Sequence, residues 1–412
     1  MHDNVMSTPN IELLAPAGNL EKLKFAIDYG ADAVYLGGKQ YGLRAFAGNF
    51  TEEDMLAGVD YAHKRGKKVY ATVNIFAHNE DLNGLEDYLL ELKNLGIDAI
   101  IASDPGVIAT CQEVIPGMEL HLSTQANCTN WKSVRFWGKQ GITRVILARE
   151  LGLREISEIS TRVPEVELEA FVHGAMCIAY SGRCLLSNYL TARDANRGAC
   201  SHPCRWKYYL MEEARPGEYF PIFEDGQGTK IMSSKDLNML EHLPTLIEAG
   251  VTRFKIEGRM KSAHYVATVV RAYRLAINAY LQDPQNYVMD EELKAELGKA
   301  ATRPFTTGFY FQAPDEGAQT YGDGDESSKF EFVGIVLDYQ RGYLQIEQRN
   351  HFQVGDELEI VEPQKHGGFL KVEEIINSSG EKVTSAPHPK EVVQIPSDRP
   401  CSSMALVRKI NG

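Results

Sequence analysis

The chain has 412 residues, with 43 Lys and Arg against 56 Asp and Glu, so its formal net charge is −13. Hydrophobic residues make up 43% and charged residues 24%, which is the composition of a globular protein and excludes disordered and collagen-like classes. No apolar run approaches the roughly 18 residues that a membrane span needs, and the start lacks the features of a secretory signal. We therefore expect a cytoplasmic protein with reduced cysteines and no membrane partner.

Short apolar, β-branched runs alternate with helical patterns along the first two thirds of the chain. The helical patterns carry end signals: Asn19 and Thr51 stand at N-cap positions, and several helices are expected to end at a Gly. Eight strands are expected, beginning near Ile11, Ala33, Lys68, Ile97, Glu119, Thr143, Val166 and Thr252.

Eight strands alternating with helices predict a parallel sheet, and at this length a closed (β/α)8 TIM-like barrel is the leading α/β fold. An open doubly wound sheet is the alternative. It is disfavoured because Ala15-Pro16-Ala17-Gly18 stands where that fold carries a Gly-x-Gly-x-x-Gly turn. A barrel places its chemistry at the carboxyl ends of the strands.

The step from the seventh to the eighth strand is far longer than one strand, loop and helix require. It predicts an insertion of about residues 174–230 after strand 7, within a catalytic barrel domain of residues 1–312. Residues 313–329, rich in Gly, Ser and acids, are expected to form an acidic linker. Beyond it the hydrophobic period changes to two, which predicts a small C-terminal β-barrel domain at 330–412.

Four of the seven cysteines lie in the insertion, as Cys177-x6-Cys184-x15-Cys200-x3-Cys204. In a reducing compartment such a cluster is typical of a metal site. The wide spacings favour an iron–sulfur cluster, whereas structural zinc sites use closely paired cysteines, and only the last pair is close. Zinc is the less favoured metal, and buried or catalytic thiols are the third alternative. Cys111 and Cys128 are expected to be ordinary core thiols.

The same stretch is basic in an acidic protein. Between Cys177 and Tyr209 there is one acid, Asp194, among five basic residues. These side chains either solvate a loop and pair with the following acids, or meet an anionic substrate such as a phosphate backbone. The residues we assign to contacts with such a phosphate backbone are Arg193, Arg197, Arg205 and Lys207.

The stretch from Glu169 to Ser187 (EAFVHGAMCIAYSGRCLLS) resembles the signature of the U32 "peptidase" family. Glu12–Gly18, Ala33–Gly37 and Lys255–Arg259 also resemble that family, and the resemblance covers roughly residues 10–310. The family name implies a collagenase-like protease, whereas its better-understood members are oxygen-independent hydroxylases of tRNA wobble uridine, of ribosomal RNA or of the ubiquinone ring.

The resemblance implies a four-cysteine iron–sulfur cluster, most simply 4Fe-4S, with Cys177, Cys184, Cys200 and Cys204 as ligands. It implies prephenate as hydroxyl source, tRNA as the expected partner and a paralogous U32 subunit as a further possible one. The chain has no His-Glu-x-x-His or Gly-x-Ser-x-Gly motif, which disfavours the peptidase, although a Cys–His pair stays open. Another hydroxylation substrate and a non-enzymatic RNA-binding or partner-binding protein are the remaining alternatives.

Polar residues near the strand ends are expected to line the barrel mouth. We assign catalytic roles to His173, Glu257 and Arg259, and co-substrate binding to Arg149 and Gln125. Arg149 and Arg259 are favoured for a dicarboxylate because a guanidinium pairs with carboxylates in a bidentate manner. The other candidates for the mouth are Glu12, Tyr35, Asn74, Asp104, Ser123 and Glu150.

Overall fold

The computed structural model describes most of the chain. The longer described ranges are 10–38, 50–176, 233–301, 303–311, 330–363 and 367–410. Shorter described pieces are 41–42, 184, 186–191, 193, 200–201, 203, 210–211, 219–220, 223–225, 228–230, 319–320 and 365. Cys177, Cys204, Arg197, Arg205 and Lys207 lie outside these residues.

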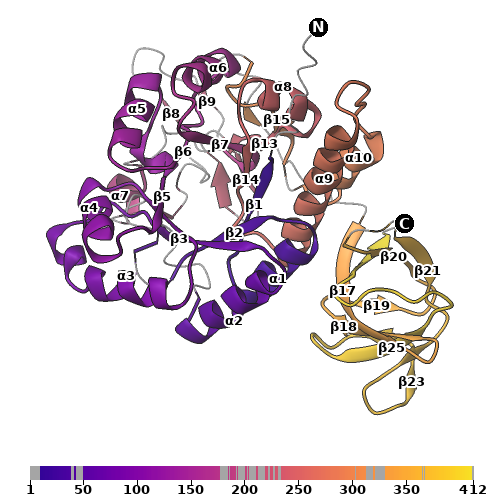
Figure 1. The fold of residues 1–412 in the computed structure, drawn as a ribbon. Helices are drawn as coiled ribbons and strands as arrows, with labels where there is room; N and C mark the ends of the chain where they lie inside the picture. The colour runs from indigo at the N-terminus through magenta and orange to yellow at the C-terminus, as the bar shows by residue number, and fades with distance from the viewer. Residues whose placement is uncertain are drawn as a thin grey trace, which may run out of the picture.

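Eight parallel strands form a closed barrel, surrounded by helices (Figure 1). The last strand, β14, pairs with β1 on one side and with β7 on the other, and this pairing closes the sheet. The predicted TIM-like barrel is thus confirmed and the open sheet was wrong. The strands are β1 Glu12–Pro16, β2 Ala33–Leu36, β3 Lys68–Val73, β4 Ala99–Ala102, β5 Glu119–Leu122, β6 Arg144–Ile146, β7 Glu167–Ala175 and β14 Arg253–Ile256.

The helices between the strands start where the sequence signals them. Asn19 accepts a hydrogen bond from the amide of Lys22 at the start of α1, and Thr51 accepts one from Asp54 at the start of α2. The helices are α1 Leu20–Asp28, α2 Glu52–His63, α3 Leu85–Asn94, α4 Pro105–Val114, α5 Trp131–Lys139, α6 Leu153–Arg162, α8 Leu243–Glu248, α9 Ala263–Gln282 and α10 Glu291–Gly298.

The insertion after β7 is described only in short pieces, among them α7 Leu186–Thr191. The chain then returns through β13 Asp236–Asn238, which pairs antiparallel with the end of β7, and β15 Phe305–Thr306 pairs with β13. The predicted linker lies outside the described residues except Gln319–Thr320, which form β16 beside Ser233–Ser234.

The C-terminal residues form an eight-stranded antiparallel sheet that curves into a half-barrel (Figure 1). In the described residues its two edge strands, β21 and β23, do not pair with each other, so the expected barrel is open on one side. Its strands are β17 Phe330–Gln340, β18 Tyr343–Gln348, β20 Glu357–Val361, β21 Gly368–Lys371, β22 Ile375–Ile376, β23 Lys382–Val383, β25 Val392–Pro396 and β26 Leu406–Ile410.

The half-barrel packs against α1, α9 and α10 of the TIM-like barrel (Figure 1). The buried Tyr29 hydroxyl donates to the carbonyl of Val361 at 2.8 Å and accepts from the amide of Leu406 at 3.1 Å. Arg408 of β26 is fully buried and donates to His264 and Thr268 of α9, each at 2.7 Å. Because these polar groups satisfy one another, the two domains share a well-defined interface.

Candidate functional site: a cationic cavity at the barrel mouth

A cavity of about 90 Å³ opens at the carboxyl ends of the barrel strands. Residues from several strands converge on it, as expected for the chemical end of this fold. Seven of its residues were predicted to line the mouth: Tyr35, Asn74, Ser123, Gln125, Arg149, Glu257 and Arg259. The remaining lining residues are Thr72, Ile101, Thr124, Ile146, Phe171 and Lys255.

Two arginines are fixed in the cavity wall by short contacts. Arg149 donates through Nη1 to the carbonyl of Ala175 at 2.9 Å, and its guanidinium lies over the Phe171 ring at 4.0 Å from the centroid. Arg259, which is 5% exposed, donates through Nη1 to the Thr72 hydroxyl at 2.9 Å. Both guanidinium groups are therefore preorganised, and Arg259 is buried while Arg149 is half-buried.

Another part of the cavity wall is neutral and polar. The side-chain amide of Asn74 donates to the Ser123 hydroxyl at 3.1 Å, and the same hydroxyl accepts from the backbone amide of Gln125 at 3.4 Å. Thr124 and Gln125 form a short 3₁₀ turn after β5 that brings their side chains to the cavity. This wall offers hydrogen-bond donors and acceptors without adding charge.

Glu257 reaches the cavity because two strand ends approach each other closely. Gly174 has a φ of +111°, and a Cβ there would lie 2.6 Å from the carbonyl oxygen of Glu257. Only Gly fits this position, since an L side chain would clash and would also strain the backbone. The approach lets the Glu257 amide donate to the carbonyl of His173 at 2.8 Å.

The structure places His173 behind the cavity wall and not among its lining residues. The register between β7 and β14 shifts after the Lys255–Phe171 pair, so that Ile256 faces His173 and Val172 is an extra residue. One extra residue turns the following side chains to the other face of a strand. His173 therefore packs against α9, with its ring centroid 5.6 Å from that of Tyr273.

The environment of His173 keeps its ring neutral. It is 2% exposed, and burial, reinforced by the charge of Lys261, lowers its pKa to about 3. A neutral, enclosed imidazole outside the cavity is suited to holding β7 against α9. The assignment of a direct catalytic role to His173 stays a prediction that this placement does not favour.

Glu12, expected at the mouth, lies at the opposite end of the barrel, and that prediction was wrong. Glu12 is the first residue of β1, and the amino ends of parallel strands meet at the base. There its carboxylate accepts from Arg144 at 2.6 Å and from the Tyr70 hydroxyl at 3.0 Å. Asp104 caps α4 instead of lining the cavity, and Glu150 is likewise not a lining residue.

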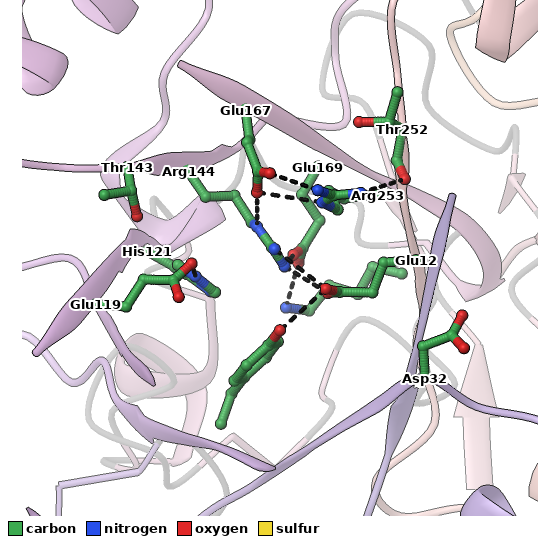
Figure 2. Close-up of polar contacts among 12 residues, drawn as sticks. Glu12, Asp32, Glu119, His121, Thr143, Arg144, Glu167, Glu169, Thr252 and Arg253 are labelled. Carbon is green, nitrogen blue, oxygen red and sulfur yellow. Dashed lines mark hydrogen bonds and ion pairs between the residues drawn. The ribbon is translucent and has the colours of Figure 1, made fainter. Parts of the chain in front are cut away.

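The base of the barrel is filled by a network of ion pairs (Figure 2). Arg144 of β6 contacts Glu12 at 2.6 Å, Glu167 at 2.9 Å and Glu169 at 3.3 Å. Arg253 of β14 donates to both oxygens of Glu167. Barrel interiors are usually packed with Val, Ile and Leu, so this charged interior is a distinctive feature of the chain.

Lys255 joins this network to the cavity and was missed as a site residue. It lines the cavity and donates to the fully buried Glu169 at 2.8 Å. The available signal was the strand period: Arg253, Lys255 and Glu257 alternate along one face of β14, and that face points into the barrel.

The described part of the cysteine insertion brings two candidate ligand segments together. Cys184 precedes α7 by two residues, and Cys200 precedes Ser201. Ser201 donates through its amide to the Ser187 hydroxyl at 3.0 Å, and its own hydroxyl lies 2.8 Å from that of Thr191. Both cysteines are partly buried there, and within the described residues no group of three metal ligands is assembled, since Cys177 and Cys204 lie outside them.

The remaining predicted residues are the basic residues of the insertion and the two cysteines outside it. Arg193 is described and exposed, while Arg197, Arg205 and Lys207 lie outside the described residues. Cys111 and Cys128 are buried, and burial raises the pKa of each thiol to about 12, so both behave as core residues. No helix within the described ranges is both long and apolar enough to span a membrane.

A closed (β/α)8 barrel with a cationic cavity at its mouth and a C-terminal half-barrel defines the class of this protein. Residues 18–320 match the model of peptidase family U32, and residues 328–408 match that of the peptidase family U32 C-terminal domain. The chain therefore belongs to peptidase family U32.

Named relatives cover nearly the whole chain. The tRNA hydroxylation protein P1 of Bacillus subtilis is 46% identical over 98% of this chain and 95% of its own length. The tRNA hydroxylation protein P of Escherichia coli is 40% identical over 97% of each chain. A collagenase of Porphyromonas gingivalis is 35% identical over 90% of this chain and 91% of its own.

Proposed function

We propose that this protein is an enzyme that hydroxylates tRNA. In its full form the proposal is an iron–sulfur-dependent, oxygen-independent conversion of wobble uridine to 5-hydroxyuridine, with prephenate as the hydroxyl source. The observation that carries it is the 46% identity, over 98% of the chain, to a protein named for tRNA hydroxylation. The cationic cavity supports the part of the proposal that concerns a small anionic co-substrate.

The cavity suits a small molecule that bears carboxylates. Arg149 follows β6 and Arg259 follows β14, and these two strands flank β7. A carbonyl holds the guanidinium of Arg149 and a hydroxyl holds that of Arg259 at the cavity. A guanidinium pairs with a carboxylate through parallel N–H···O bonds. Asn74, Ser123 and Gln125 on the neutral wall would then bind the uncharged hydroxyl and carbonyl groups.

Cys184 and Cys200 fit a shared metal centre because the Ser187–Ser201 contacts hold their segments together. In the sequence, Cys177 follows the last residue of β7 by two positions. We assign these three and Cys204 as the ligands of a 4Fe-4S cluster, with zinc as the less favoured occupant. When bound, such a cluster would supply one-electron chemistry.

A net charge of −13 repels RNA, so binding has to rely on a local basic field. Our candidate for this role is Arg193, which is exposed and follows α7 by two residues, and Arg197, Arg205 and Lys207 extend the basic stretch in the sequence. A target base reaches an enclosed site only after it leaves its stack, and the free energy of unstacking is small in a single-stranded anticodon loop.

A paralogous U32 subunit as a further partner stays a prediction.

The second candidate is a peptidase, favoured by the 35% identity to a collagenase. Peptide hydrolysis needs an activated nucleophile or a metal-bound water. Among the described lining residues, the hydroxyl of Ser123 is engaged by an amide of Asn74 and not by a base, and His173 lies outside the cavity. The site therefore supports hydroxylation better than proteolysis.

Mass spectrometry of tRNA nucleosides tests the proposal. Cells lacking the gene should lose 5-hydroxyuridine and its derivatives, and the wild-type gene should restore them. C184A and C200A should not restore them, whereas C401A, in the C-terminal domain, should. Unchanged nucleosides in the deletion strain, together with cleavage of casein or collagen by pure protein, would favour the peptidase.

A further inference from the structure

Lys255 presents a buried ammonium group at the floor of the cavity. The residue is 4% exposed, and Nζ lies 4.5 Å from the Tyr35 ring centroid and 5.6 Å from that of Phe171. Among the described residues, the ammonium has one hydrogen-bond acceptor, a carboxylate oxygen of Glu169 at 2.8 Å. An ammonium has three N–H donors, so two are left for a ligand or water in the cavity.

A rigid column of charges holds this ammonium in place from below. Glu169 is fully buried and accepts from Lys255 on one oxygen and from Arg144 on the other. Figure 2 shows Arg144 in turn between Glu12, Glu167 and Glu169. The column consists of three cations, Arg144, Arg253 and Lys255, and three carboxylates, Glu12, Glu167 and Glu169. Its net charge is therefore zero without an ion from solvent.

The cavity above the column is cationic. Arg149 and Arg259 share it with Lys255, and Glu257 is the one acid among its described lining residues. An apolar interior would pack at least as stably as buried ion pairs, so an interior cation that reaches a cavity points to binding rather than to stability alone. The ligand class that matches three converging cations is a small organic anion with carboxylate groups.

We propose that Lys255 binds a carboxylate of the small-molecule co-substrate at the cavity floor, and that Glu169 is the residue that positions it. This inference rests on the proposed function, because it assumes that the cavity takes the hydroxyl donor. It adds a third anion-binding residue, on the strand face between Arg253 and Glu257, to the two arginines of the wall.

Glu169 also keeps the ammonium charged. Burial lowers the pKa of Lys255, and the carboxylate of Glu169 opposes that effect, while Arg144 and Arg149 reinforce it. Glu257 and Arg259 share the cavity, and Tyr35 and Phe171 face the ammonium with their rings. An anion site that uses this ammonium is lost as the pH rises through the pKa of Lys255.

Calorimetric titration of prephenate into the anaerobically prepared holoenzyme tests the inference. K255M should weaken binding about 10- to 100-fold, the loss expected for a hydrogen bond to a charged group. R274M is the matched control: it removes a mostly buried cation of α9 that pairs with Asp32 and neither belongs to the column nor lines the cavity. R274M should bind prephenate within about twofold of wild type, and thermal unfolding of each variant checks that it is folded.

E169Q tests positioning separately from folding. Without the carboxylate the pKa of Lys255 falls further, so prephenate binding should be lost at a lower pH than in wild type. A purely structural role would leave this pH profile unchanged. If K255M does not fold, the pH profile of prephenate binding to E169Q tests the proposal by itself: a profile shifted to lower pH supports it, and an unchanged profile overturns it.

The outcomes separate the inference from the proposed function. Wild-type affinity in K255M, or an equal loss in K255M and R274M, would overturn the role of Lys255 and leave the hydroxylase standing. A wild-type holoenzyme that binds neither prephenate nor simple dicarboxylates would overturn both the anion site and prephenate as co-substrate.

Discussion

Arg144 and Glu12 form an ion pair of 2.6 Å that crosses the lumen of the barrel. Arg144 belongs to β6 and Glu12 to β1, and neither strand pairs with the other in the sheet. The pair therefore braces opposite walls, where most barrels of this class rely on interdigitated apolar side chains. Arg144 is 2% exposed, so its charge depends on these partners instead of on water.

Removal of the Arg144 charge should destabilise the barrel. R144M leaves the carboxylates of Glu12, Glu167 and Glu169 facing one another without their shared cation. Loss of one partner from a buried ion pair costs about 3–5 kcal/mol. Urea denaturation should show this decrease in the free energy of unfolding.

An exposed arginine provides the control. R162M removes an i,i+4 pair with Glu158, whose side chains are about half exposed, and should change the free energy of unfolding by less than about 1 kcal/mol. Equal effects of R144M and R162M would show that the buried network is not a brace.

His264 should make the domain interface sensitive to acid. Burial, reinforced by Arg408, lowers its pKa from 6.5 to about 3, and its Nε2 accepts from Arg408 at 2.7 Å. The unfolded chain binds this proton near pH 6.5 and the folded chain only near pH 3, so stability falls as the pH falls through that window. The expected loss is up to about 1.4 kcal/mol for each pH unit.

The variant H264Q isolates this contribution. Its amide oxygen can still accept from Arg408 but does not titrate. The free energy of unfolding should therefore fall less steeply between about pH 6.5 and pH 5 in H264Q than in wild type. The same slope in both proteins would contradict the assignment.

The colour and iron content of cysteine variants should distinguish the proposed cluster ligands from Cys401, which lies in the C-terminal domain. Anaerobically purified wild type should be brown, with iron and sulfide near about four each for a cubane cluster. C184A and C200A should lose the absorbance, and C401A should keep it. Stoichiometric zinc in unbleached protein would contradict the iron–sulfur assignment.

Arg193 should contribute one phosphate contact to tRNA binding. R193A should lower the slope of log affinity against log salt by roughly 0.7–0.9, with the cluster absorbance unchanged. R162A, which removes an exposed arginine on the outside of the barrel, is the control and should leave the slope unchanged. An unchanged slope in R193A would assign Arg193 to the structure of the loop.

The sequence predicted the barrel because each of its strands is a short apolar run with a helix signal after it. It failed where the pattern is broken. At β7 the register shift turns His173 outward, and a single extra residue leaves no mark on the alternation of apolar residues. Glu12 stands at the start of β1, and the start of a parallel strand lies at the base of the barrel and not at its mouth.

In the C-terminal domain, Arg408 interrupts the apolar period of β26, which weakens the sequence signal of that strand. That arginine is fully buried against α9 and α10, and its partners His264 and Glu296 are more than 100 residues away in the chain. Lys255 was missed as a site residue because a charged residue is expected in solvent unless its distant partner, here Glu169, is known.

The most direct test of the central claim follows the transferred oxygen. The holoenzyme would be incubated without dioxygen with tRNA from the deletion strain and prephenate that carries a heavy oxygen isotope in its ring hydroxyl. We expect 5-hydroxyuridine that carries the heavy isotope, detected by nucleoside mass spectrometry, and less product with K255M at low prephenate. Product whose oxygen derives from water, or no product from folded wild-type protein that contains its cluster, would contradict the account.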